Sequence, residues 1–124
     1  VLDKAGRVQI PRELLEQLGV QGNKVRLEMT DGKIIISAPE EKELIRFIAS
    51  FTQELIDAAE ARDPARLTRY CSELATLFHK FYNACRVKGE DESLMQARLA
   101  LCDAARITLR RGLTLLSVSV PEKM

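Results

Sequence analysis

The hydrophobic period of this chain changes once, near residues 37–39, and that change constrains the fold more than any other feature of the sequence. Before it, apolar and polar residues alternate in short runs, as in half-buried strands. After it, apolar residues recur at spacings of three and four, as in helices. The sequence therefore predicts an α+β chain with two modules, residues 1–38 and residues 39–124.

The first module is predicted to hold short strands around one short helix. Residues 6–11 alternate and predict a strand, whose last residue is a proline placed where a helix would begin. Leucines then form an apolar face up to Gly19, which is expected to end that helix. Residues 25–29 and 33–36 are predicted strands. Asp31-Gly32 between them favours a two-residue hairpin turn, because both turn positions need positive φ.

The second module is predicted to be a bundle of three helices. Apolar residues at helical spacing indicate a helix or broken helix over residues 41–61, a second helix over 64–85 and a third over about 94–116. A polar loop at residues 88–92 separates the last two. The fold expected for the whole chain is thus a small β-hairpin module followed by an α-helical bundle.

Two local patterns mark where helices of this bundle are expected to begin. Asp63 precedes Pro64, which combines an N-cap residue with a proline at the first helical position. Ser93 and Gln96 form a capping-box pattern, in which each side chain bonds to the backbone of the other residue. The third helix is therefore expected to follow Ser93 directly.

Composition excludes several classes of protein. The net charge of the 124 residues is +1, so any nucleic-acid surface must be a local patch. No apolar run approaches the roughly 20 residues that cross a bilayer. The cysteines Cys71, Cys85 and Cys102 form no C-x-x-C pair, and His79 has no metal-ligand spacing. We expect buried, reduced thiols in a cytoplasmic protein with no metal and no cofactor.

Three runs of the first module carry a family resemblance: DKAGRVQIPREL at residues 3–14, LGV at 18–20 and DGKIII at 31–36. Together they resemble the AbrB/MazE swapped-hairpin family. The resemblance implies two chains that interleave their hairpins in a dimeric barrel, and duplex DNA as a partner through Lys4, Arg7 and Arg12. Residues 1–40 hold six basic and six acidic residues, so this neutral module is expected to favour dimerisation over DNA binding.

Five runs of the second module carry another resemblance: PEEKELI at 39–45, LTRY at 67–70, LFHKFYNACRV at 77–87, QARLAL at 96–101 and SVPEKM at 119–124. They resemble the C-terminal DALR anticodon-binding domain of bacterial arginyl-tRNA synthetase. The resemblance implies a helical bundle that binds the anticodon stem and loop of an arginine-type tRNA. The family's usual first helix, before the segment matching residue 41, is missing here. The histidine-glycine and lysine-serine signatures of the catalytic domain are also absent, so no enzymatic activity is expected.

The candidate tRNA-binding residues are His79, Tyr82, Asn83, Arg86, Arg106, Arg110 and Met124. Aromatic and amide side chains on the second helix could stack on unpaired bases or hydrogen-bond to them. Arginines on one side of the last helix could contact phosphates, although an ordinary solvated face explains them equally well. The resemblance places the chain's last residue near the anticodon, whereas a frayed terminus is the default interpretation.

Three other residues of the helical module are expected to be structural. Phe78 and Phe81 are predicted to lie in the core. Arg98 falls among apolar residues of the last helix, where a charge must pair with another group, so we predict a clamp of the bundle and not a phosphate ligand. No nucleophile or acid near His79 in the sequence supports a catalytic role for it.

The leading hypothesis is therefore a non-catalytic tRNA-binding module joined to a dimerising hairpin module. The alternatives are an AbrB-type DNA-binding transcriptional regulator, with the helices as an effector or oligomerisation domain, and an artificial fusion with no evolved joint function. A homodimer is expected for two reasons. An isolated hairpin buries too little apolar surface to stand alone, and an incomplete bundle leaves an apolar face open.

Overall fold

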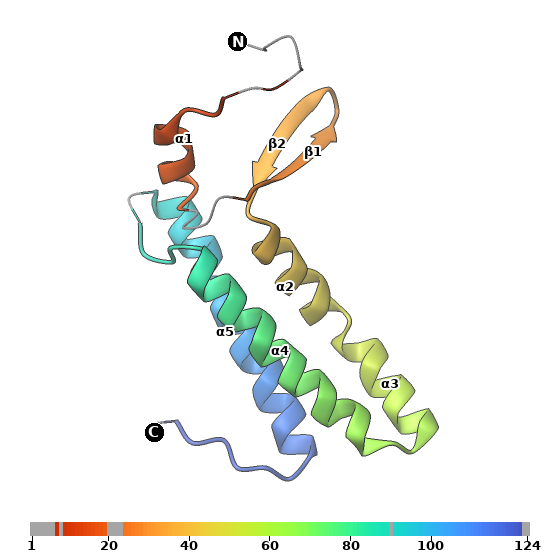
Figure 1. Ribbon diagram of the computed structural model, residues 1–124. Coiled ribbons are helices and arrows are strands. Elements are labelled where there is room, and N and C mark those ends of the chain that lie inside the picture. Colours follow the sequence, from red (N-terminus) through yellow and green to blue (C-terminus); the bar gives the residue numbers. More distant parts are fainter. Residues whose placement is uncertain (1–6, 8, 20–23, 90, 123–124) are drawn as a thin grey trace.

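The computed structural model describes residues 7, 9–19, 24–89 and 91–122. Within these residues the chain is mostly helical and has one short N-terminal hairpin. The elements are α1 (Arg12–Gln17), β1 (Arg26–Thr30), β2 (Lys33–Ser37), α2 (Pro39–Ala49), α3 (Phe51–Ala61), α4 (Pro64–Ala84) and α5 (Glu92–Leu115). Figure 1 shows α4 and α5 side by side, α2 and α3 following one another along α4, and α1 with the hairpin at one end.

The short helix predicted after Pro11 is present as α1, whereas the strand predicted before it is not present among the described residues. Pro11 directly precedes α1, and Gly19 follows it with φ of +61°. The predicted strand at residues 6–11 is wrong for the residues that the structure describes, since residues 7 and 9–11 lie outside any strand. An alternating pattern supplies one apolar face but no partner for the backbone, and the sheet formed by the described residues pairs β1 with β2.

The hairpin is built as predicted. β1 and β2 pair antiparallel, with Arg26 opposite Ser37 at one end of the hairpin and Thr30 opposite Lys33 at the turn. Asp31 and Gly32 connect them with φ of +51° and +72°, the left-handed conformations that a two-residue turn of this type requires. Glu28 forms an ion pair with Lys42, which ties β1 to the first turn of α2.

Residues 41–61 were predicted as a helix or a broken helix, and the structure has the broken form, so the helical part contains the four helices α2 to α5. The break falls at Ser50, whose hydroxyl donates a 2.6 Å hydrogen bond to the carbonyl of Phe47. The Tyr70 hydroxyl donates to the same carbonyl, at 2.5 Å. Side chains that compete for a helix carbonyl bend the helix, so α2 and α3 can each pack against α4 with their own orientation.

Aspartates cap both long helices. Asp63 accepts a hydrogen bond from the Ala65 amide at 3.0 Å, which confirms the predicted start of α4. The capping box predicted at Ser93 is wrong, since Asp91 accepts from the Leu94 amide at 2.9 Å and α5 begins at residue 92. Aspartate is as good an N-cap as serine, and the earlier cap adds two residues to the helix.

The core lies between α2, α4 and α5. Phe81, Leu44 and Leu74 are almost fully buried, and Phe47 stacks on Tyr70 with ring centroids 4.4 Å apart. Phe81 therefore occupies the core as predicted, whereas Phe78 is only partly buried at its edge. In the part of the chain that the structure describes, no helix is long and apolar enough to cross a membrane.

We predict that Gly112→Ala destabilises the fold. A methyl group at this position would lie 2.6 Å from the Cys71 sulfur, so the Cys71 side chain or one of the two helices would have to shift. Overpacking of this kind costs about 1–3 kcal/mol, and we expect the free energy of unfolding in urea to fall by that amount. Gly89→Ala is the control, since nothing lies within 4 Å of its added methyl group.

The same contact predicts coupling between two substitutions. Cys71→Ala removes the atom that the new methyl group meets, so Gly112→Ala should cost less in the Cys71→Ala background than alone. Equal costs in the two backgrounds would contradict a tight α4–α5 contact at this position.

Candidate nucleic-acid interface

A short row of aromatic side chains lies along the exposed side of α4. Phe78, His79 and Tyr82 neighbour one another because residues three and four apart share one face of a helix. The rings of Phe78 and Tyr82 stack with centroids 6.0 Å apart, and His79 meets Phe78 edge-on at 6.2 Å. Tyr82 is 57% exposed. The ring of Tyr82 is therefore accessible to a planar ligand, which could stack on it.

This row borders an apolar groove between α4 and α5, with a volume of about 590 Å³. Phe78 and His79 line it from α4, while Leu99, Cys102 and Arg106 are among the residues that line it from α5. Leu99 is 46% exposed and adds apolar surface to the open side of the groove. An apolar groove with a few polar groups at its rim is the common form of a ligand site.

Arg106 supplies the positive charge at this rim. Its guanidinium bonds to Asp103 one turn earlier on α5, with Nε 2.8 Å and Nη2 2.7 Å from the carboxylate. Both side chains are more than half exposed, so this pair contributes little to stability and can exchange partners. Arg106 can thus turn toward a phosphate at the groove without loss of a buried contact.

Only some of the predicted tRNA-binding residues gather at this groove. His79 and Arg106 line it, and Tyr82 stacks on Phe78, which also lines it. Asn83 and Arg86 lie exposed farther along α4 and just after it. The remaining two predicted residues, Arg110 and Met124, lie elsewhere or outside the described residues.

Arg110 faces a separate hollow between α3 and α5, which Phe51, Leu55 and Arg111 also line. Its guanidinium is 3.9 Å from Glu122. Met124 lies outside the residues that the structure describes. The sequence missed Phe78, Leu99 and Cys102 as groove residues, because apolar periodicity marks a side chain as inward-facing without showing how closely two helices approach.

The residues proposed for DNA binding form no comparable surface among the described residues. Arg7 and Arg12 are both exposed, the first before α1 and the second at its start. Lys4 lies outside the described residues.

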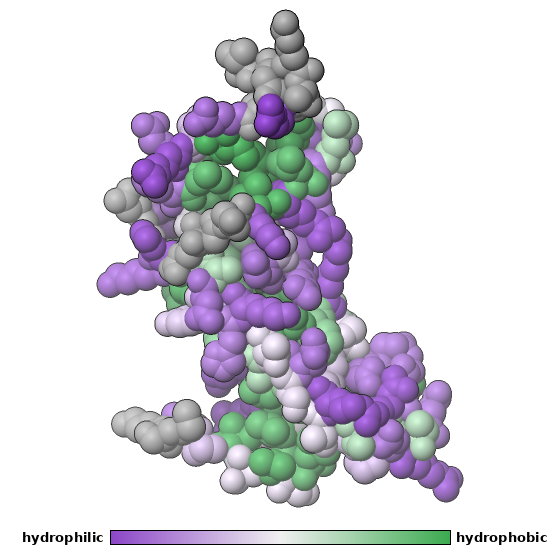
Figure 2. Space-filling view, viewed as in Figure 1, coloured by the Kyte–Doolittle hydropathy of each residue, from purple (hydrophilic) through white to green (hydrophobic). Residues whose placement is uncertain are grey.

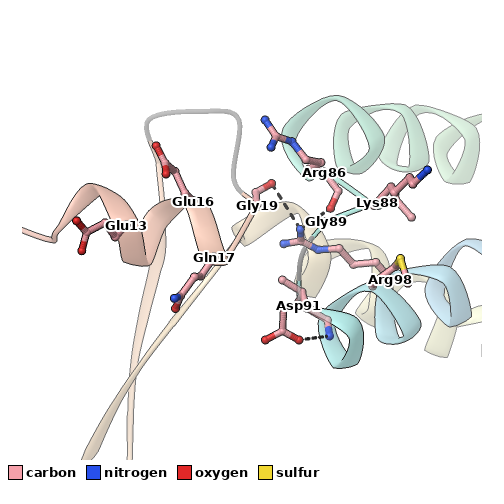
Figure 3. A pocket seen from close by; sticks show the side chains of 12 residues that line it. Glu13, Glu16, Gln17, Gly19, Arg86, Lys88, Gly89, Asp91 and Arg98 are labelled. Carbon is pink, nitrogen blue, oxygen red and sulfur yellow. Dashed lines mark hydrogen bonds between the residues drawn. The ribbon is translucent and has the colours of Figure 1, made fainter.

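Arg98 confirms its prediction as a structural clamp. It is 2% exposed although it carries a charge. Its Nε pairs with Glu41 of α2, its Nη2 donates to the Leu18 carbonyl, and its Nη1 donates to the Arg86 carbonyl at 2.7 Å. Figure 3 shows the guanidinium reaching between Gly19 and the loop after α4. One side chain therefore joins α1, α2, α4 and α5.

The hollow beside Arg98 has mixed charge. The residues that line it are Glu13 and Glu16 of α1, Arg86 and Lys88 of the loop after α4, and Asp91, the N-cap of α5 (Figure 3). Acidic groups at one wall oppose the attraction that the basic groups exert on a phosphate. The charges lining this hollow therefore largely offset one another.

The cysteines are free thiols, two of them buried. Burial raises the pKa of Cys85 to about 12, and the nearby Glu41 adds to this effect. Burial also raises the pKa of the groove thiol, Cys102, which opposes the thiolate that nucleophilic catalysis needs. Within the described residues, no three His, Cys, Asp or Glu side chains are grouped so that they could hold a metal ion.

Comparison with known proteins gives one consistent match. The family model described as DALR anticodon binding domain matches residues 12–124. An arginine–tRNA ligase of Ruminiclostridium cellulolyticum is 46% identical over 115 residues, covering 90% of this chain and 19% of the relative. That of Acetivibrio thermocellus is 42% identical over 111 residues, covering 90% and 20%. That of Carboxydothermus hydrogenoformans is 51% identical over 90 residues, covering 73% and 16%.

This chain spans about a fifth of the length of the curated relatives it matches. The resemblance that the sequence suggested for residues 39–124 extends through residues 12–38, and the comparisons show no separate AbrB-like domain. A domain boundary near residue 38 stays a prediction. No solved structure matches the chain.

We predict that Arg98→Ala lowers the free energy of unfolding by about 3–5 kcal/mol, because it leaves Glu41 and several backbone carbonyls without their shared donor. Arg98→Lys should recover only part of this loss, since an ammonium cannot reproduce the planar fork. Arg106→Ala removes an exposed arginine from the same helix and should leave stability nearly unchanged. Denaturant titrations that give Arg98→Ala the same free energy of unfolding as Arg106→Ala would contradict the clamp.

Proposed function

This chain belongs to the DALR anticodon binding domain family, and from that premise we propose that the α4–α5 groove binds the anticodon stem and loop of a tRNA. The observation that carries the proposal is the exposed ring of Tyr82, stacked on Phe78 at the edge of an apolar groove. Anticodon-loop bases are unpaired, so their faces are open to aromatic side chains. A base stacked on Tyr82 would continue the row that Phe78 begins.

The polar residues near this ring have distinct proposed roles. His79 and Asn83 are proposed to hydrogen-bond to base edges, since both lie exposed on α4 within one turn of Tyr82. Arg106 at the groove and Arg86 after α4 are proposed phosphate ligands. Arg110 would contact the nucleic acid only beyond the groove, because it lies at the α3–α5 hollow.

An arginine-accepting tRNA is the proposed partner, because the relatives are named as arginine–tRNA ligases. These 124 residues are proposed to act by binding alone, since burial raises the pKa of the Cys102 thiol, which disfavours a thiolate nucleophile, and no nucleotide-binding signature occurs in the sequence. Homodimerisation stays a prediction, supported by the exposed apolar residues of the hairpin.

We predict that Tyr82→Ala weakens binding of an arginine anticodon stem-loop RNA by about 1–3 kcal/mol, the contribution of one base stacked on an aromatic ring. Tyr82→Phe should bind like the original chain, because it keeps the ring. Fluorescence anisotropy with labelled RNA would measure both.

Two controls make this test specific. Ile56→Ala shortens an exposed side chain on α3, away from the groove, and should leave the affinity unchanged. Labelled duplex DNA at the same salt concentration should bind more weakly than the RNA. Equal affinities of Tyr82→Ala and the original chain, with helicity retained, would return Tyr82 to an ordinary surface position, and tighter binding of the duplex would favour the DNA-binding alternative.

We predict a shallow salt dependence for this RNA binding. With few arginines near the groove, the slope of log K against log salt concentration should be on the order of three to four. Arg106→Ala should reduce the slope by about one if it contacts a phosphate. A titration from low to physiological salt would measure both slopes, and a slope unaffected by Arg106→Ala would contradict its role.

A further inference from the structure

The hairpin exposes an apolar face that the helices do not cover. Leu27 and Met29 of β1 pair with Ile36 and Ile34 of β2, so these four side chains share one face of the sheet. Leu27, Met29 and Ile34 are 59%, 78% and 68% exposed. Figure 2 shows apolar atoms gathered at the end of the molecule that carries the hairpin. Two strands alone are marginally stable in water, so this hairpin calls for a further partner.

The turn determines which backbone groups are available to that partner. A two-residue turn closes on a hydrogen-bonded pair, here Thr30 and Lys33. Pairs alternate along an antiparallel ladder, so Glu28 and Ile35 also bond to each other. The amides and carbonyls of Ile34 and Ile36 then point outward from the edge of β2, and those of Leu27 and Met29 point outward from the edge of β1.

The two edges differ in how they are protected against strand addition. β1 carries Arg26 and Glu28, which are bonded to each other at 3.0 Å, and Lys42 pairs with the same glutamate. Charged residues on an edge strand oppose pairing with another strand. Residues 34–36 of β2 are three consecutive isoleucines without a charge. Among the residues that the structure describes, the edge of β2 is therefore the less protected one.

We propose that the edge of β2 binds β2 of a second copy of this chain, antiparallel and with the twofold axis at Ile35. In this register Ile34 bonds to the partner's Ile36 in both directions, and the symmetric pair repeats the bonds. Lys33 stands opposite the partner's Ser37, so no like charges meet. The result is a four-stranded sheet with one continuous apolar face.

A second copy suits this edge better than an unrelated strand. The segment KIIIS has a polar residue at each end and three isoleucines between them, so it is complementary to itself when reversed. A twofold contact is also the commonest way in which identical chains associate. The pairing uses the hairpin, which lies at one end of the molecule (Figure 1), and involves none of the residues that line the α4–α5 groove.

The first test uses proline at an outward-facing amide. Ile34→Pro removes the donor that points toward the partner, while the internal ladder of the hairpin keeps its hydrogen bonds. Met29→Pro is the matched control, because it sits directly across the hairpin at the edge of β1. Sedimentation equilibrium of the full chain from roughly 1 to 500 μM covers the affinities expected of a small interface.

We expect the original chain and Met29→Pro to approach twice the 14.0 kDa chain mass, and Ile34→Pro to weaken the dimer roughly tenfold or more. A chain that stays monomeric over this range would overturn the proposal. Equal weakening by two proline variants that both keep the hairpin folded would overturn it too, because it would show that the apolar faces stack instead of the β2 edges pairing.

A second measurement covers the case in which proline unfolds the hairpin. Ile35→Cys places two thiols on the twofold axis, at a pair whose Cα atoms lie about 4.5 Å apart and can form a disulfide. In a Cys102→Ser background this variant should oxidise to a covalent dimer, whereas Met29→Cys should not. Failure of Ile35→Cys to cross-link, or equal cross-linking of Met29→Cys, would contradict the register.

Discussion

The buried guanidinium of Arg98 is the interaction on which the arrangement of this chain depends. Helix α1 has no fully buried residue of its own, so apolar packing contributes little to holding it against the helical body. Its attachment instead consists of hydrogen bonds from Arg98 to the carbonyls of Leu18 and Gly19, and of the Arg86 amide to Gly19 at 2.7 Å. Glu41 neutralises the charge that makes these bonds strong.

Elements whose signals are local could be predicted from the sequence. Asp31-Gly32 favours the positive φ angles of a two-residue turn, and Asp63 accepts a hydrogen bond from an amide two residues later. Both features depend only on residues that are close in the sequence. The strand expected at residues 6–11 is the opposite case, because a strand exists only with a partner that periodicity cannot supply. The break at Ser50 also depends on distant contacts, since Tyr70 of another helix shares the carbonyl that Ser50 uses.

The candidate site was predicted less completely than the fold. Tyr82 and His79 belong to a run of aromatic residues that the sequence displays, and Arg98 was marked by its position among apolar residues. The groove itself depends on the distance between α4 and α5, which no pattern within either helix encodes. For the same reason Arg106 and Arg110 were assigned to one surface, although they line different hollows a single helical turn apart.

The hydrogen bonds of Arg98 also determine which substitutions this sequence can accept near the clamp. The Arg98 guanidinium donates hydrogen bonds to the backbone oxygens of residues 18 and 86, and every amino acid has such an oxygen. Side chains at those two positions can therefore change without weakening the clamp. Gly19 cannot change in the same way, because its φ is +61° and a methyl group there would lie 2.5 Å from Arg98. The clamp thus restricts residues 19, 41 and 98 and does not restrict the side chain of residue 18, whereas selection on the Arg86 side chain comes from whatever it binds.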